Sequence, residues 1–157
     1  MRFDDGSRAL YAGDASNFRQ VPIGVVIPRT LDDVVAVHRI CREFGVPILN
    51  RGGGTSLSGE TVNHAVVIDH SKYLTEIGEV DPEVRTVTCE TGVINEELNR
   101  STGRWNLVFG GASVGALGRR WSERQAAVGI SPLLTNARRR LSSRVVVGRV
   151  PAGRMSA

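Results

Sequence analysis

The chain has 157 residues, 41% of them hydrophobic, which is enough to bury a core in one domain or in one domain with a tail. It contains no run of about 18 apolar residues, which argues against a membrane span, and its acidic start lacks the apolar stretch of a secretory signal, so we predict a cytoplasmic protein. The net charge of +4 is divided unevenly: residues 1–110 hold 11 basic and 15 acidic residues (−4), whereas residues 111–157 hold nine arginines and one acid (+8).

The first regular elements form a strand, a helix and a second strand. An apolar run at residues 25–27 predicts a buried strand. Thr30 is expected to cap a helix with an apolar face, and Gly45 is placed to end that helix in a left-handed conformation. Residues 46–49 form the next apolar run. Two strands joined by a helix in about 25 residues predict a βαβ unit, which favours parallel strands.

Further elements follow at short intervals up to residue 109. Residues 65–69 read as a third buried strand. Residues 77–80 and 86–89 are expected to pair across a turn that contains Asp81, Pro82 and Glu83. A short helix over residues 93–101 and a strand that starts near residue 107 complete the pattern. We therefore predict an α+β fold.

A glycine-rich loop, "LNRGGGTSLSG" at residues 49–59, directly follows the second strand. Glycine allows the backbone to approach a ligand closely, and successive amides at the end of a strand can converge on a phosphate. The spacing excludes both common nucleotide motifs, because no Lys follows Gly59 and the third position of G-x-G-x-x-G falls on Leu57. A phosphate or pyrophosphate cradle is one reading, and a flexible surface turn is the alternative.

The segment "DASNFRQVPIGVVIPRTLDDVVAVHRICREFGVPILNRGGGTSLSG" resembles the N-terminal part of the FAD-binding domain of FAD-linked oxidases. These enzymes share the fold of vanillyl-alcohol oxidase and p-cresol methylhydroxylase (PCMH). The likeness is strongest to the FAD subunit of glycolate oxidase and to D-lactate dehydrogenases, including large forms with a C-terminal iron–sulfur region. It implies that residues 7–110 form the first α/β subdomain of a PCMH-type FAD-binding domain.

The same resemblance implies which residues contact the cofactor. In this family the loop wraps the FAD pyrophosphate with backbone amides, and the matching positions are Arg51, Gly52, Gly53, Gly54, Thr55, Ser56 and Gly59. Some relatives carry a histidine at the position of Thr55 that bonds covalently to the flavin, so non-covalent FAD is implied here. UDP-N-acetylenolpyruvoylglucosamine reductase has a similar loop, but Thr-Ser follows the glycines in this chain and the upstream segment fits the hydroxy-acid enzymes better.

Residues 111–157 are predicted to lie outside the folded domain. Gly, Ala, Ser and Arg supply 28 of these 47 residues, and Asp, Lys, Tyr and Phe do not occur. Such a mixture is typical of GC-rich DNA read out of frame, so one interpretation is that the native reading frame is lost near Gly110. A genuine disordered basic tail is the alternative. The segment lacks interleaved aromatic residues, so no specific nucleic-acid partner is predicted.

The other residues that could carry chemistry form no catalytic or metal-binding set. His38 lies at helical spacing, and His64 and His70 flank the third strand without a paired carboxylate. Cys41 and Cys89 are isolated, and Cys41 is expected to be a buried thiol. We therefore predict no catalytic residue and no metal site.

The function implied by the resemblance is flavin-dependent oxidation of a D-2-hydroxy acid of the lactate or glycolate class. The likeness stops after Gly110, before the second glycine-rich stretch and the substrate domain of the family. The chain is therefore expected to be incomplete and inactive alone, with a hydroxy-acid substrate only in a full-length parent. The alternative function is a non-catalytic fragment that holds the phosphates of a nucleotide.

Overall fold

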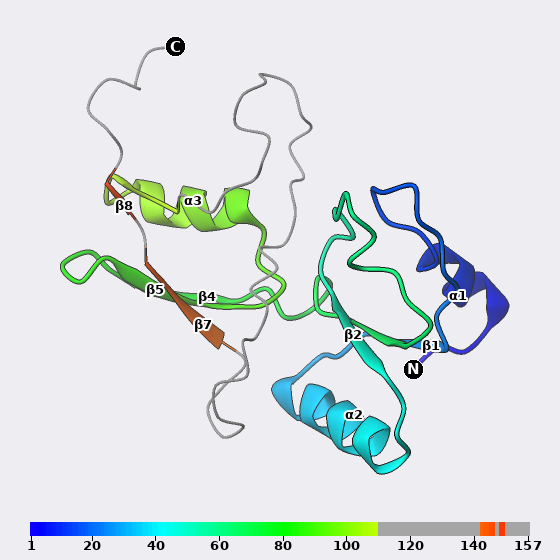
Figure 1. The fold of residues 1–157 in the computed structure, drawn as a ribbon. Coiled ribbons are helices and arrows are strands. Elements are labelled where there is room, and N and C mark those ends of the chain that lie inside the picture. The colour runs from blue at the N-terminus through cyan, green and yellow to red at the C-terminus, as the bar shows by residue number, and fades with distance from the viewer. Residues whose placement is uncertain (110–141, 147, 150–157) are drawn as a thin grey trace. The chain divides into compact units, whose positions relative to one another are not determined.

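The computed structural model describes residues 1–109, 142–146 and 148–149, and the chain divides into two compact units (Figure 1). The first unit comprises residues 1–75 and the second unit residues 76–157. Among the described residues the first unit contains one sheet and the second unit contains two, and each unit has its own buried cluster. The mixed helix and strand content confirms the α+β prediction.

A three-stranded parallel sheet forms the centre of the first unit. Its strands are β1 (Gly24–Val26), β2 (Ile48–Arg51) and β3 (Val66–Asp69), in the order β1-β3-β2. The helix α2 (Leu31–Glu43) connects β1 to β2, and β3 pairs between them. The predicted βαβ unit is therefore confirmed, although its two strands are not direct neighbours.

The helix α2 begins and ends where its sequence predicts. The Thr30 hydroxyl accepts a hydrogen bond from the Asp33 amide at 3.2 Å, and the Asp33 carboxylate accepts from the Thr30 amide at 3.0 Å, which completes a capping box. Gly45 follows the helix with a φ of 63°. These signals are local, which is why the chain sequence alone places them correctly.

The two faces of the sheet carry different side chains, because successive residues of a strand point to opposite sides. The helix α2 lies against one face of the sheet (Figure 1), and side chains from the two form an apolar cluster. This cluster contains Val26, Val37, Cys41, Val66 and Ile68. Cys41 is 6% exposed, which confirms the predicted buried thiol. Arg51 and Asp69 belong to the opposite face of the sheet, and both side chains contact Tyr11.

Two features of the first unit differ from the sequence prediction. The strand expected at residues 46–49 is instead Ile48–Arg51, because pairing continues until the Arg51 carbonyl accepts from the His70 amide at 3.0 Å. A short helix, α1 (Asp5–Leu10), was not predicted. Its cap is the Asp4 side chain, which accepts from the Ser7 amide at 2.8 Å, and it is too short to display a helical apolar period.

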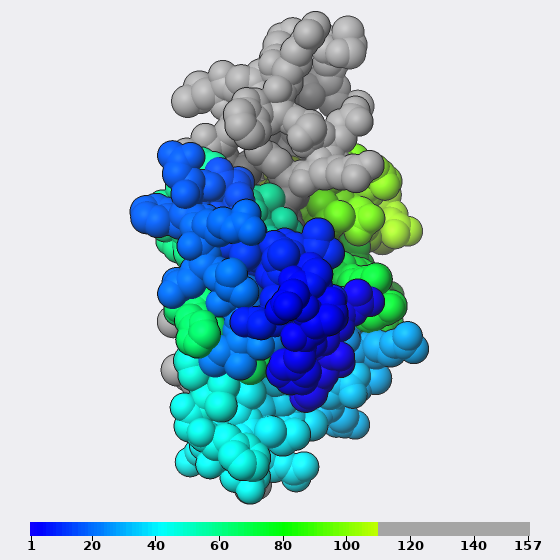
Figure 2. Space-filling view, turned by 90° about the vertical axis from the view of Figure 1, so that its right-hand side faces the viewer, coloured from blue at the N-terminus to red at the C-terminus, as the bar shows by residue number. Residues whose placement is uncertain are grey.

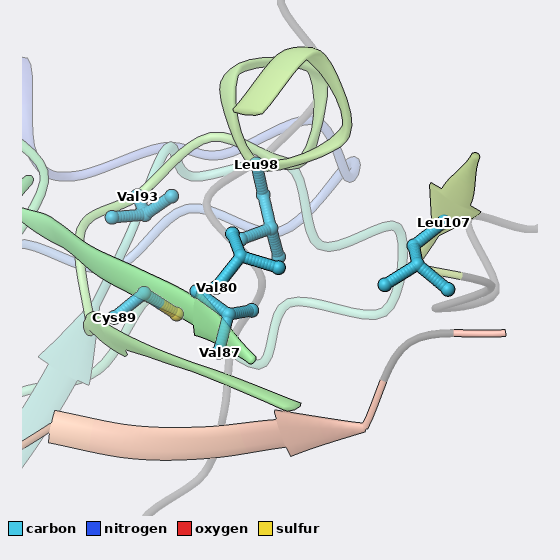
Figure 3. Close-up of a cluster of buried hydrophobic side chains, with 6 residues drawn as sticks. All are labelled: Val80, Val87, Cys89, Val93, Leu98 and Leu107. Atoms are coloured by element: carbon cyan, nitrogen blue, oxygen red, sulfur yellow. The ribbon is translucent and has the colours of Figure 1, made fainter. Parts of the chain in front are cut away.

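The second unit begins with an antiparallel hairpin. Its strands are β4 (Ile77–Asp81) and β5 (Thr86–Glu90), as predicted, and Asp81 stabilises the turn by accepting from the amides of Glu83 and Val84. The helix α3 (Asn95–Gly103) packs over this hairpin (Figure 3). Side chains from the hairpin, α3, the connection between them and the strand β6 (Leu107–Val108) form one buried cluster of Val80, Val87, Cys89, Val93, Leu98 and Leu107.

Two described strands lie within residues 111–157. The strand β7 (Ser142–Val146) pairs antiparallel with β5, and β8 (Gly148–Arg149) pairs antiparallel with β6. The rest of this segment lies outside the described residues. The interpretation of residues 111–157 as disordered or frame-shifted therefore stays a prediction, as does the domain boundary at residue 110.

No helix within the described ranges combines the length and the apolar character needed to cross a lipid bilayer.

Candidate cofactor-binding site

The glycine-rich loop leaves the sheet at the carboxyl end of β2. Arg51 is the last residue of the strand, and the loop runs from Gly52 until β3 begins at Val66. Ligands of open parallel sheets bind outside this edge, where the loops that follow neighbouring strands meet. The structure therefore brings all seven predicted cofactor contacts together at one edge of the first unit.

The first backbone amides of this loop differ from the later ones, because the amides of Ser58, Glu60, Thr61 and Val62 have protein acceptors. Within the described part of the chain, no amide of residues 52–57 donates a hydrogen bond to another protein atom. Buried or ordered amides normally have an acceptor, and amides without one in a protein are available to water or to a ligand anion. Within the described residues, the amides of residues 52–57 are therefore available as donors to a ligand anion such as a diphosphate.

Two glycines of the loop adopt backbone conformations that other residues rarely adopt. Gly54 has a φ of 69°, and a Cβ at this position would collide with the Arg51 guanidinium. Gly59 has a φ of 75°, and a Cβ there would lie 2.8 Å from the Phe18 ring. Gly54 therefore gives the loop its path around Arg51.

Arg51 holds its positive charge at the base of the loop. Its guanidinium donates to the carbonyls of Gly13 at 2.9 Å and Thr61 at 3.0 Å, and it lies 5.2 Å from the centre of the Tyr11 ring. Among the described residues Arg51 forms no ion pair with a carboxylate. The guanidinium is held in place by two carbonyls without a carboxylate partner in the described part of the chain, which favours an anion nearby.

Two hydroxyl residues of the loop, Thr55 and Ser56, differ in how available they are to a ligand. The Ser56 hydroxyl accepts from the Glu60 amide at 3.0 Å and so is committed to the turn of the loop itself. Thr55 is exposed, and no hydrogen bond of its side chain occurs within the described residues. Thr55 is therefore the hydroxyl that is more available to a ligand.

Sequence reasoning missed a tyrosine–carboxylate pair beneath the loop. The Tyr11 hydroxyl donates to Asp69 Oδ2 at 2.6 Å, and Asp69 Oδ1 accepts from the amide and hydroxyl of Ser71. Burial and the bond to Asp69 raise the pKa of Tyr11 to about 12. These residues are 58 positions apart in the sequence, so no local signal could have paired them.

His70 lies at the same sheet edge but belongs to the α2 side. Its side chain is 6% exposed, and Nε2 lies 3.0 Å from Asn50 Oδ1, which makes Nε2 the donor. Nδ1 has no partner among the described residues. Burial lowers the pKa of His70, so the ring is neutral at neutral pH. In the part of the chain that the structure describes, no carboxylate forms a hydrogen bond with the His70 ring, and we propose no catalytic role for it.

Comparison with known families identifies the domain. Residues 22–120 match the family model described as "FAD binding domain". The chain belongs to this FAD-binding family. The match contains the whole glycine-rich loop and extends ten residues beyond the boundary predicted at residue 110, whereas residues 1–21 lie outside it.

Curated relatives of this FAD-binding domain include several hydroxy-acid dehydrogenases. D-lactate dehydrogenase (cytochrome) of Kluyveromyces lactis is 37% identical over 111 residues, or 68% of this chain and 19% of the relative. Glycolate oxidase subunit GlcD of Bacillus subtilis is 35% identical over 111 residues, or 68% of this chain and 24% of the relative. D-2-hydroxyglutarate dehydrogenase of Haemophilus influenzae is 30% identical over 105 residues, or 65% of this chain and 10% of the relative. The chain thus spans a quarter or less of these proteins.

Solved structures confirm the fold of this FAD-binding domain. Alkyldihydroxyacetonephosphate synthase matches with a TM-score of 0.60 at 18% identity, over 69% of this chain and 23% of that protein. The 6-hydroxy-D-nicotine oxidase of Arthrobacter nicotinovorans matches with a TM-score of 0.59 at 21% identity, over 69% of this chain and 24% of that protein. The resemblance to PCMH-type FAD-binding domains, inferred from the sequence, is therefore confirmed.

Proposed function

We propose that the glycine-rich loop of this FAD-binding domain holds the diphosphate of FAD non-covalently. The observation that carries this proposal is that the amides of residues 52–57 have no acceptor among the described residues, in a loop that the left-handed Gly54 bends around the Arg51 guanidinium. Arg51, Gly52, Gly53, Gly54, Thr55, Ser56 and Gly59 would form the contact surface. Bound FAD would supply hydride-acceptor chemistry, and these residues would hold and orient it.

The absence of a covalent bond follows from the chemistry of Thr55. A flavin attached to the protein needs a nucleophilic side chain such as an imidazole, and Thr55 offers a hydroxyl group at the matching position. Thr55 is exposed on the loop and can donate a hydrogen bond to a phosphate oxygen. We therefore expect denaturation to release intact FAD.

We further propose that the domain serves a flavin-dependent oxidoreductase that acts on a D-2-hydroxy acid of the lactate or glycolate class. The names of the curated relatives support this class. The chain spans a quarter or less of each relative, so we propose that oxidation of the hydroxy acid needs protein beyond this chain. The described residues would supply cofactor binding without proton transfer.

The test is a titration of FAD that follows quenching of flavin fluorescence. If the loop holds the diphosphate, ADP competes with FAD, whereas riboflavin, which lacks phosphate, neither binds nor competes. After acid precipitation the flavin is expected in the supernatant, which checks the non-covalent mode. Absence of FAD binding at any concentration up to the millimolar range would refute the cofactor assignment.

A second measurement addresses the enzymatic role. Bound FAD is mixed without oxygen with D-lactate, glycolate or D-2-hydroxyglutarate, and flavin absorbance is followed. We expect no reduction by this chain alone. Reduction of the flavin by any of the three would contradict the proposal that the chain is inactive by itself. Binding of ADP and pyrophosphate with no preference for FAD would instead favour the alternative of a nucleotide-phosphate-binding fragment.

A further inference from the structure

A segment that precedes the family match is tied to the glycine-rich loop at three points. We call residues 13–16 the clasp. The Gly13 carbonyl accepts from Arg51 at 2.9 Å, and the Ala15 amide donates to the Gly54 carbonyl at 3.0 Å. The family match begins only at residue 22. In Figure 1 the blue segment after α1 runs beside the loop after β2, and Figure 2 shows blue residues of this part on the surface.

The third attachment is the carboxylate of Asp14. Its Oδ2 accepts from the Thr61 hydroxyl at 2.8 Å and, more weakly, from the Thr61 amide at 3.4 Å. Its Oδ1 accepts from the amide and the hydroxyl of Ser16, so Asp14 also makes hydrogen bonds within the clasp. Arg51, which precedes the loop, donates to the Thr61 carbonyl. Thr61 is thus bound by both Arg51 and Asp14, and these bonds keep the beginning of the loop close to Thr61.

A carboxylate close to an anion site calls for an explanation. Electrostatics alone would disfavour it, because Asp14 carries the same sign of charge as a diphosphate. Burial works to raise the pKa of Asp14, but the hydrogen bonds from Ser16 and Thr61 outweigh it, so this pKa lies below the usual range and the group stays ionised. All four of its hydrogen bonds go to the clasp and to Thr61. The geometry therefore gives Asp14 a role in shape.

Resting on the proposed function, we propose that Asp14 is a positioning residue for the diphosphate loop. A loop rich in glycine and serine loses much conformational entropy when a ligand orders it, and a loop ordered in advance binds more tightly. The clasp orders both ends and the middle of the loop. The clasp also holds the Gly54 carbonyl oxygen in a hydrogen bond with the Ala15 amide, so this partly negative oxygen is directed toward the protein.

A positioning role and simple electrostatics predict opposite effects on FAD affinity when the charge of Asp14 is removed. Asp14→Asn removes a negative charge, which by itself would strengthen binding of an anion. The amide, however, has a single oxygen, so it cannot accept from the backbone amides of both Ser16 and Thr61, and its NH2 group faces one of these donors. We expect FAD binding to weaken at least about tenfold, as for the loss of hydrogen bonds to a charged group. Asp32→Asn is the matched control, because Asp32 is exposed on α2.

Thr61 provides a second, milder variant in case Asp14→Asn folds poorly. Thr61→Val keeps the shape and the backbone but loses the hydroxyl that donates to Asp14 at 2.8 Å. Thr61→Ser restores a hydroxyl. We expect weaker FAD binding in Thr61→Val and recovery to within about twofold in Thr61→Ser, since only the valine leaves an acceptor unpaired.

A readout without FAD separates this proposal from the proposed function. Trypsin cleaves after arginine, and cleavage between Arg51 and Gly52 requires the guanidinium to leave the Gly13 and Thr61 carbonyls. Cleavage at this bond should accelerate severalfold in Asp14→Asn and Thr61→Val. Cleavage after Arg85, in the β4–β5 turn, serves as the internal reference and should not change.

The outcomes distinguish the two proposals. Unchanged or tighter FAD binding in a folded Asp14→Asn protein would overturn the positioning role, as would unchanged cleavage after Arg51 in both variants. If the unaltered protein binds no FAD, the proposed function fails, and the cleavage rates alone still decide whether Asp14 positions the loop. Weaker binding, faster cleavage after Arg51 and rescue by Thr61→Ser together would establish it.

Discussion

Replacement of Gly54 by alanine tests the architecture of the loop most directly. Gly54 has a φ of 69°, and a Cβ there would collide with the Arg51 guanidinium. Gly45, which follows α2, has a φ of 63°, but a Cβ there would meet no atom within 4 Å. Gly45→Ala is therefore a matched control that carries the backbone strain without the collision.

The expected loss of stability follows from two contributions. Left-handed backbone strain is about 1–2 kcal/mol for alanine and is common to both variants. In Gly54→Ala the Arg51 Nη2 that the Cβ meets must also leave the Gly13 carbonyl, and loss of one hydrogen bond to a charged group is on the order of 1.5–3 kcal/mol. Gly54→Ala should thus lose about 3–5 kcal/mol, against about 1–2 kcal/mol for Gly45→Ala.

The assay is native-state hydrogen exchange of β3 amides, which report the first unit by itself. Val67 and Ile68 are fully buried in this strand, so the free energy of opening measured at their amides follows the stability of the sheet. FAD is omitted so that ligand binding does not contribute. Equal losses in the two variants, within about 0.5 kcal/mol, would refute the reasoning, because the guanidinium would then cost nothing to displace.

Three further predictions concern single side chains. Leu98→Ala should lower the free energy of unfolding of the second unit by about 2–5 kcal/mol, measured by urea with tryptophan fluorescence, because Leu98 is 1% exposed in the cluster beneath α3. The pKa of Tyr11 is raised to about 12 in the folded state, so the stability contributed by its protonated hydroxyl is complete below pH 10 and is lost between pH 10 and 12. Tyr11→Phe should remove this loss of stability. Unfolding followed by circular dichroism at a series of pH values measures it. Burial lowers the pKa of His70 from its ordinary 6.5, so its contribution is complete above pH 6.5 and declines as the pH falls below that value. His70→Gln should flatten this part of the stability curve, and an unchanged slope would contradict the buried neutral ring.

Local signals in the sequence were sufficient for most elements of the fold. The capping box at Thr30, the left-handed Gly45 and the turn at Asp81 depend on residues only a few positions apart, so short stretches of sequence contain all the information. The glycine-rich loop was visible for the same reason. The resemblance of this loop and of the segment before it to FAD-linked oxidases indicated the FAD-binding family, which the comparison confirmed.

The sequence predicted less well where an element depends on distant partners. The strand β2 runs two residues beyond the predicted end, because its limit is set by pairing with β3. The helix α1 is only six residues long, too short for an apolar period, and its start depends on the single cap at Asp4. Residues 110–141 lie outside the described ranges, and the predictions for them remain as stated.

What the sequence by itself determined is the identity of the loop: glycines, hydroxyl residues and one arginine at the end of an apolar strand. What only the tertiary structure decided is how that loop is held. Tyr11, Asp14 and Asp69 come together with Arg51 across separations of up to 58 residues. No periodicity or spacing encodes such contacts, because they arise only when the segment after α1 folds back onto the carboxyl edge of the parallel sheet.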